Sequence, residues 1–298
     1  MAFDRRAQNR EVFEDAMRLC KKNNQLRQAI EASKAKQYVV ADEEEITAEE
    51  SRRFDAPAKV VVSRKRSLEA AGNKAYEGFK VCVHNFASAT NPGGGVVSGA
   101  SAQEECICRC STLYPNLNIY AVRSTFHEKH KMLLRQGQMD AAYNDDCVFT
   151  PEIVVFKTDD DACKTMEEAQ WYRVDVITCA APNLRKRPSN AMNPNSGTKA
   201  LEISNEQLQK LHEKRLRRIL TIAKKEKEDV VILGAFGCGA FQNPPEVVAR
   251  AYKNVIPEFL YDFRAIEFAV YCAPHAVKNY DEFYEAFGKT QVHENGFQ

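Results

Sequence analysis

The sequence predicts an α/β protein in which a mixed β-sheet is flanked by helices, with a helical extension at the N-terminus. Short apolar segments alternate with helical segments along most of the chain, and two of the apolar segments each lead into a glycine-rich loop. The length, 298 residues, allows one large domain or two small ones. Hydrophobic residues make up 44% and charged residues 28%, which argues against disorder over most of the chain.

The order of elements follows from the spacing of apolar residues. Residues 8–35 place Val12, Phe13, Ala16, Met17 and Cys20 on one face of a helix, and an acidic connector follows at 42–50. Strands are expected at 59–62, 79–85, 147–157 with a break at Pro151, 172–180, 230–233 and 265–272. Helices are expected at 67–76, 100–113, 204–225 and 245–255. Apolar strands separated by helices indicate a sheet that is covered on both faces.

Charge and cysteine content narrow the function classes. Lys plus Arg is 42 and Asp plus Glu is 41, and a net charge of +1 argues against a protein that coats polyanions, although it leaves room for a local basic pocket. Ten cysteines without a visible signal peptide lead us to expect a cytoplasmic protein with reduced thiols. The chain lacks an apolar run near the roughly 20 residues that span a bilayer, so we expect no membrane partner.

The first glycine-rich loop, Asn91-Pro92-Gly93-Gly94-Gly95, lies between a predicted strand and a predicted helix. Three consecutive glycines permit positive φ angles and let backbone N–H groups approach an anion or a sugar. A flexible turn is the alternative, because a triple glycine alone is weak evidence of function.

The second loop, residues 234–241 (GAFGCGAF), follows an apolar strand and precedes a helix that opens with Asn243 as the expected N-cap and two prolines. A helix N-terminus beside such a loop favours phosphate. Neither loop fits G-x-G-x-x-G or the P-loop, so a dinucleotide dehydrogenase and an NTPase are disfavoured. Because ligands of open α/β sheets bind beyond the carboxyl ends of strands, two such loops suit a diphosphate. Phe236 and Phe241 either pack in the core or contact a ribose or base.

Two glutamates open the helix after the first loop. Ser101 and Glu104 fit the capping box S-x-x-E, which gives Glu104 a structural role. Glu105 points about 100° away around the helix, so the two carboxylates have different roles. A carboxyl beside a sugar-binding loop is suited to protonate a leaving oxygen and to deprotonate water.

Metal chemistry is not expected. Cys106, Cys108 and Cys110 lack a second C-x-x-C pair. His127 and His130 lack the i, i+4 spacing of H-E-x-x-H, and their segment is expected to be a solvated helix. The loop at 182–198 is too long for a simple connection and is more consistent with a functional or mobile segment.

The motifs in combination resemble those of poly(ADP-ribose) glycohydrolases. Residues 85–95 (NFASATNPGGG) followed by Gln103-Glu104-Glu105 are similar to the GGG and QEE pattern of that family. Residues 180–183 (AAPN) resemble the pattern of its bacterial-type branch, and residues 234–241 resemble its diphosphate-binding loop. The resemblance runs from about 85 to 241 and implies a macrodomain-like catalytic domain at 56–298, preceded by a helical accessory segment at 1–55.

The resemblance also implies roles for individual residues. Glu105 would be the general acid/base at the ribose–ribose O-glycosidic bond, and Glu104 would bind hydroxyls of the ribose on the leaving side. Gln103 would shape the site, and Asn85 or Asn91 would hold the ribose or brace the loop. The remaining binding residues would come from the two loops: Gly93, Gly94 and Gly95 beside the terminal ADP-ribose, Gly237, Cys238 and Gly239 around the diphosphate, and Phe241 on the distal ribose. Gly234, Phe236 and Ala240 of the second loop would also belong to the substrate-binding site.

The expected partners are ADP-ribose and poly(ADP-ribose), including polymer attached to ADP-ribosylated proteins. No cofactor, metal or sequence-specific nucleic acid is expected. Two alternatives use the same pocket: a macrodomain that binds ADP-ribose without cleaving it, and a hydrolase of mono-ADP-ribose on protein or nucleic acid. The glutamate pair favours the enzyme, because a binding module needs no general acid. The element that would stack on adenine has no match in the motifs.

Overall fold

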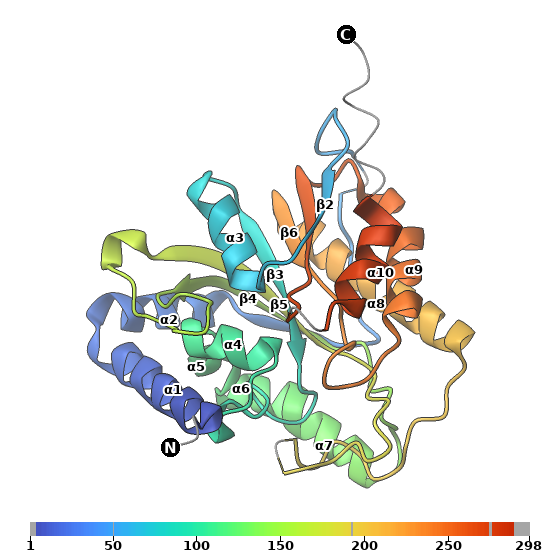
Figure 1. The fold of residues 1–298 in the computed structure, drawn as a ribbon, viewed down its shortest axis with the longest axis horizontal. Coiled ribbons are helices and arrows are strands. Elements are labelled where there is room, and N and C mark those ends of the chain that lie inside the picture. The colour runs from blue at the N-terminus through green and yellow to red at the C-terminus, as the bar shows by residue number, and fades with distance from the viewer. Residues whose placement is uncertain (1–3, 50, 192, 274–275, 289–298) are drawn as a thin grey trace.

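The computed structural model describes residues 4–49, 51–191, 193–273 and 276–288. Its centre is a seven-stranded sheet in the order β1-β4-β5-β3-β6-β7-β2 (Figure 1). The strands are β1 (Tyr38–Val40), β2 (Lys59–Ser63), β3 (Val81–Ala87), β4 (Cys147–Val155), β5 (Tyr172–Ala180), β6 (Val230–Leu233) and β7 (Ala265–Ala269). β5, β3, β6, β7 and β2 run parallel, whereas β1 and β4 are antiparallel to their neighbours. The predicted mixed sheet is confirmed.

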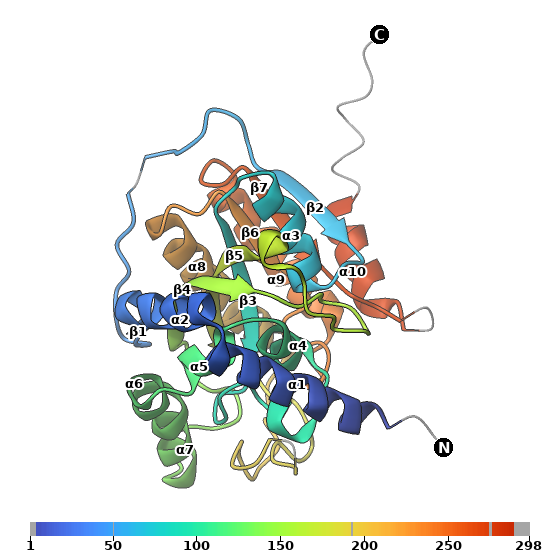
Figure 2. The same ribbon diagram turned by 90° about the vertical axis from the view of Figure 1, so that its left-hand side faces the viewer.

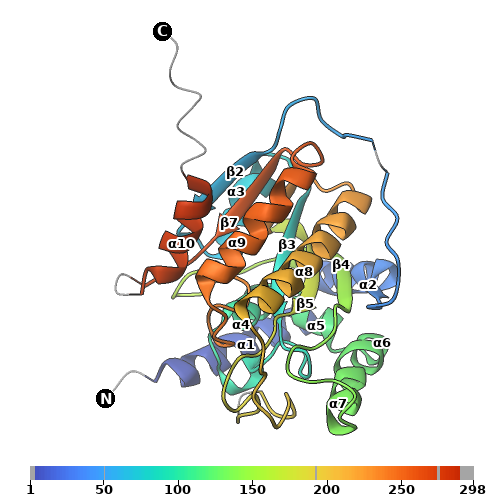
Figure 3. The same cartoon turned by 90° about the vertical axis from the view of Figure 1, so that its right-hand side faces the viewer.

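Helices cover both faces of the sheet, as predicted. α8 (Asn205–Lys225), α9 (Pro245–Val255) and α10 (Lys278–Phe287) lie on one face, where Figure 3 shows α8 and α9 side by side. α3 (Ser67–Tyr76), α4 (Gln103–Cys110) and α5 (Leu113–Leu117) lie on the other face (Figure 1). After α5, the chain forms α6 (Tyr120–Val122), a π-helical turn (Arg123–His127) and α7 (Glu128–Arg135).

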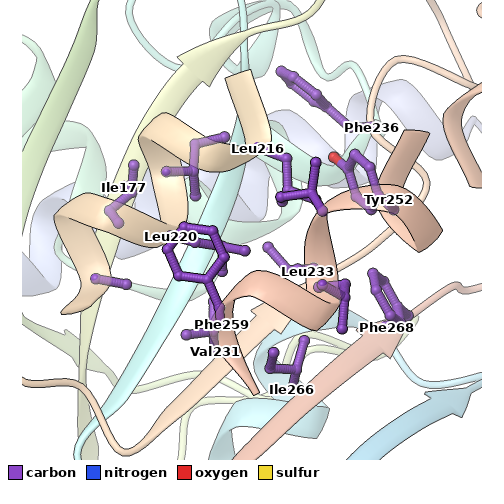
Figure 4. Close-up of a cluster of buried hydrophobic side chains, with 14 of the residues drawn as sticks. Ile177, Leu216, Leu220, Val231, Leu233, Phe236, Tyr252, Phe259, Ile266 and Phe268 are labelled. Atoms are coloured by element: carbon purple, nitrogen blue, oxygen red, sulfur yellow. The ribbon is translucent and has the colours of Figure 1, made fainter. Parts of the chain in front are cut away.

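The two faces of the sheet build two hydrophobic cores, because successive side chains of a strand point to opposite faces. Val231 and Leu233 of β6 pack with Leu216 and Leu220 of α8 and with Tyr252 of α9 (Figure 4). Val230 and Ile232 of the same strand belong to the opposite core, with residues of α3, α4 and α5. The strand is buried on both sides, which explains its unbroken apolar sequence.

The N-terminal segment contributes to the sheet. α1 (Arg5–Lys22) and α2 (Asn24–Lys36) replace the single helix expected at 8–35, because Asn23 leaves the helical conformation and its side chain caps α2 through the N–H of Leu26. β1 then pairs with β4 at one edge of the sheet, and β2 lies at the opposite edge. Residues 41–49 and 51–58, between these two strands, lie on the outside of the molecule (Figure 2). A strand of three residues was not predicted.

Other boundaries differ from expectation for local reasons. β4 is one strand rather than a broken pair, with a register shift between Thr150 and Ile153 that absorbs Pro151. The helix expected at 100–113 is shorter and ends at Cys110. The segment expected to be a solvated helix instead buries His127 and His130, whose Nδ1 atoms lie 3.3 and 3.1 Å from the carbonyl oxygen of Ala89.

Within the described part of the chain, no helix is both long and apolar enough to cross a membrane.

Candidate active site

A cavity of about 1160 Å³ opens at the carboxyl ends of the parallel strands. Its wall is formed by segments that follow five of them: the loop after β3, residue 181 after β5, the loop after β6, residues 270 and 271 after β7, and residues 66 and 67 after β2. Open parallel sheets bind ligands at this edge. The N-terminal part of α1, the helix α4, the turn at 159–163 and residues 185, 190, 191 and 193 also contribute to the wall.

The first glycine-rich loop approaches the carboxylates so closely that it excludes a side chain. Gly94 has a φ of +58°, and a Cβ atom there would lie 2.5 Å from Oε1 of Glu105 and 3.0 Å from Oε2 of Glu104. The loop is fixed from outside the cavity by Asn91, whose Nδ2 donates to Oδ1 of Asn193 and to the carbonyl oxygen of Pro194. The sequence therefore requires glycine where the backbone passes between two acids.

The two glutamates have different surroundings. Glu105 accepts a hydrogen bond at Oε1 from the backbone N–H of Gly95 over 2.8 Å, while its buried Oε2 has no hydrogen-bond partner among the described residues. Glu104 accepts from the N–H of Ser88 over 2.7 Å and from Nδ2 of Asn85 over 3.4 Å. Glu104 is thus held as an acceptor, and Glu105 retains one oxygen that can carry a proton.

The capping box predicted for α4 is wrong. Ala102 is the N-cap and no side chain caps the helix. Glu104 turns toward Ser88 because the loop after β3 offers it a backbone donor inside the protein. Gln103 acts in a similar way: its Oε1 accepts from the N–H of Phe86, and its Nε2 donates to the carbonyl oxygen of His84.

Burial dominates the electrostatics of the pair. Glu104 is 2% exposed and Glu105 is 7% exposed. Loss of water raises the pKa of both carboxyl groups, and the charge of Glu105 raises the pKa of Glu104 further. The N–H of Gly95 and the guanidinium of Arg109 oppose the increase at Glu105. Because both carboxyl groups are buried and close together, the protonated form of each is favoured. A general acid must carry a proton in this way.

The second loop is fixed by Asn243. Its Nδ2 donates to the carbonyl oxygens of Pro182 and Gly237, and its Oδ1 lies 2.9 Å from Nε2 of His212. The N-cap of α9 is Pro244 rather than Asn243, because the side chain of Asn243 joins the loop after β6 to the loop after β5. Gly237 has a φ of +78°, and a Cβ atom there would lie 2.6 Å from Nδ2 of Asn243.

The cavity brings together most of the residues predicted for the site, namely Gly94, Gly95, Gln103, Glu104, Glu105, Gly237, Gly239, Ala240 and Phe241. The other predicted residues do not line the cavity: Asn85, Asn91, Gly93, Gly234, Phe236 and Cys238. Phe236 is fully buried and packs its ring against His84 at 4.4 Å between centroids, so the structure places it in the core.

Several wall residues were not predicted. Arg66 follows β2 and places its guanidinium 4.5 Å from the centre of the Tyr271 ring, which is 54% exposed at the end of β7. Arg109 lies one helical turn after Glu105, is buried, and donates to the carbonyl oxygen of Ala100. The basic run at 64–66 was the available signal for Arg66.

The described residues contain no cluster of three or more histidine, cysteine, aspartate or glutamate side chains arranged to hold a metal ion.

Comparison with known proteins agrees with this geometry. Residues 8–158, just over half of the chain, match the family model described as microbial-type PARG, catalytic domain. The chain belongs to the microbial-type PARG family. This confirms the resemblance drawn from the GGG and QEE motifs. No curated protein sequence matches the chain.

Solved structures of microbial-type PARG enzymes share the fold. The poly(ADP-ribose) glycohydrolase of Thermomonospora curvata is 26% identical with a TM-score of 0.79, and the alignment covers 94% of this chain and all of that one. The enzyme of Deinococcus radiodurans in complex with ADP-ribose is 26% identical with a TM-score of 0.67, over 88% of this chain and 97% of that one. The Thermomonospora enzyme bound to the inhibitor ADP-HPD, 24% identical with a TM-score of 0.75, has the same fold.

Proposed function

We propose that this protein hydrolyses the ribose–ribose O-glycosidic bonds of poly(ADP-ribose) and releases ADP-ribose, with Glu105 as the general acid/base. Membership in the microbial-type PARG family supports the substrate class and the reaction. One observation carries the assignment of Glu105: Oε1 is fixed by the N–H of Gly95, and Oε2 is buried without a partner beside the cavity. That oxygen is positioned to exchange a proton with a bound substrate.

The mechanism follows from the protonation state. Protonated Glu105 donates to the departing ribose oxygen as the C–O bond breaks, and positive charge develops on the sugar that remains. The resulting carboxylate then accepts a proton from a water molecule, whose oxygen attacks the anomeric carbon. Products are free ADP-ribose and a polymer that is shorter by the released part, and Glu105 regains its proton.

Neighbouring residues position the substrate in this proposal. Glu104, oriented by Ser88 and Asn85, binds ribose hydroxyls. Gly237 and Gly239 bring the backbone of the second loop to the diphosphate. Phe241 packs on the distal ribose and orients its anomeric carbon.

We also propose the division of the chain into an accessory segment at 1–55 and a catalytic domain at 56–298, and a cytoplasmic location. β1, which pairs with β4, makes the accessory segment part of the sheet rather than a loose extension. The ten free cysteines suit a reducing compartment.

Purified protein incubated with poly(ADP-ribose) and, separately, with a mono-ADP-ribosylated protein tests the proposal. We expect ADP-ribose to be released from the polymer while the final protein-bound unit stays attached. Binding of polymer without release would assign the chain as a reader of ADP-ribose. Faster release from the modified protein would assign it as a mono-ADP-ribosyl hydrolase.

A further inference from the structure

A cysteine of the cavity wall, Cys163, lies beside a buried cysteine, Cys110. Cys110 is the last residue of α4 and is fully buried, whereas Cys163 is half-buried and lines the cavity. Cys163 packs against the core cluster that contains Cys110, and the two thiols lie close enough to shift each other's pKa. Both are free cysteines.

The backbone holds the pair together. The N–H groups of Phe156 and Lys157 both donate to the carbonyl oxygen of Cys110, and the Cys110 thiol lies 3.4 Å from the carbonyl oxygen of Thr158. The turn that carries Cys163 closes on the same strand end, because the N–H of Thr158 donates to the carbonyl oxygen of Lys164. Both cysteines are therefore fixed to residues 156–158.

Charge distinguishes the two sulfurs. The hydrogen bond from Cys110 lowers the pKa of the Cys163 thiol to about 7, and the guanidinium of Arg109 contributes to the decrease. The same hydrogen bond and burial raise the pKa of Cys110. Cys163 is accessible and carries thiolate near neutral pH, which are the properties of an attacking thiol, and Cys110 lies in the position of a resolving thiol.

We propose that Cys110 and Cys163 form a reversible disulfide when the protein meets a disulfide oxidant such as oxidised glutathione. The Cys163 thiolate attacks one glutathione sulfur, breaks the S–S bond and releases glutathione thiolate, which takes up a proton. Cys110 then loses its proton to solvent and attacks the sulfur of Cys163, which releases the second glutathione. The protein pair is oxidised by two electrons, and one glutathione disulfide is reduced to two thiols.

The bond would tie the helix of the two glutamates to the turn at 158–164 of the cavity wall. The turn at 158–164 also carries Asp161, which forms ion pairs with Arg5 of α1 and with Arg66. A disulfide brings two sulfurs to about 2 Å, so the turn moves toward α4 when the bond forms.

The chain contains a matched control. Cys147 and Cys179 lie opposite each other on β4 and β5, and their thiols are also in contact, but both residues are fully buried. If proximity of the thiols were sufficient for oxidation, both pairs would form disulfides. If solvent access and a thiolate are also required, only Cys110 and Cys163 should form one.

The test uses the full-length protein, reduced, freed of reductant and then exposed to glutathione disulfide. After denaturation, alkylation of free thiols and trypsin digestion, we expect the peptide 110–123 linked to the peptide 158–164, and the link to disappear with dithiothreitol. Cys147 and Cys179 are expected to be alkylated. Cys163→Ser should remove the link and leave Cys110 alkylated, while Cys106→Ser should keep the link.

Two results would overturn the proposal. One is wild-type protein in which Cys163 carries glutathione but never links to Cys110. The other is linkage of Cys163 to the peptide 81–109, which would make Cys82, Cys106 or Cys108 its partner. Both are read from the wild-type protein, so the outcome does not depend on the folding of a variant.

Discussion

The backbone N–H of Gly95 donates a hydrogen bond of 2.8 Å to Oε1 of Glu105. This contact joins the glycine-rich loop after β3 to the helix that follows it, while the other carboxylate oxygen is buried without a hydrogen-bond partner among the described residues. It depends on the preceding residue, because only glycine at position 94 lets the loop pass the carboxylates.

Gly94→Ala should therefore reduce activity by about 100-fold while the protein still folds. The added Cβ would displace the carboxylate of Glu105, and a misplacement of about 1 Å can reduce a rate by roughly 100-fold. The positive φ should also cost about 1 kcal/mol of folding free energy. Steady-state kinetics and thermal unfolding measure the two effects.

Gly137→Ala is the matched control for Gly94→Ala. Gly137 has a φ of +68° but open space around its Cβ position, and it lies outside the cavity wall. We expect a similar loss of stability with activity retained. Equal losses of activity in both variants would mean that backbone strain, and not the carboxylate contact, explains the requirement for glycine.

The pH dependence of the rate should shift when Arg109 is replaced. If protonated Glu105 is the acid, the rate falls as pH rises through its pKa, which burial raises and Arg109 lowers. Arg109→Met removes the lowering charge, so the alkaline limb of the profile should move to higher pH. Arg109→Lys keeps the charge and should leave the limb near its wild-type position. An unchanged limb in both variants would argue that another group sets it.

The folding stability of the protein should depend on pH because Glu105 is buried. The folded protein binds the proton of Glu105 more tightly than the unfolded chain does, so stability falls as pH rises from the usual glutamate pKa through the raised one. Glu105→Gln cannot ionise, and its amide nitrogen replaces the oxygen that lacks a partner. We expect the variant to melt at a higher temperature than wild type at neutral pH, with the difference shrinking near pH 4. A lower melting temperature at neutral pH would refute this.

Replacing the two phenylalanines of the second loop should have different effects: one variant should lose substrate affinity and the other should lose folding stability. Phe241 lines the cavity, so Phe241→Ala should raise KM about 10-fold through lost packing on the substrate. Phe236 lies in the core against His84 and Phe86, so Phe236→Ala should cost about 3–5 kcal/mol of folding free energy. Kinetics and chemical denaturation distinguish them, and the reverse pattern would contradict the placement of both rings.

The sequence predicted elements whose evidence is local. The strands at 172–180 and 230–233 and the helix at 245–255 agree with the structure at their boundaries, because burial on both faces or a clear amphipathic pattern marks each of them. The glutamates and both glycine-rich loops were found because each motif is contiguous. β1 was missed because three residues are too few for a periodic pattern.

The missed site residues depend on the order of strands in the sheet. Arg66 follows β2 and Tyr271 follows β7, and the two meet because β2 pairs with β7 beside β6. The spacing of residues along the chain does not show which strands pair, so this contact could not be predicted from it. The capping box failed for a similar reason, since the donor that Glu104 prefers, the N–H of Ser88, becomes its neighbour only after folding.

The central claim, that Glu105 supplies the proton, is tested most directly by Glu105→Gln with poly(ADP-ribose) as substrate. The account predicts that release of ADP-ribose falls by about 1000-fold, within the range for loss of a general acid, while calorimetry shows affinity for ADP-ribose within a few-fold of wild type. Release of ADP-ribose at a rate near that of wild type would contradict it.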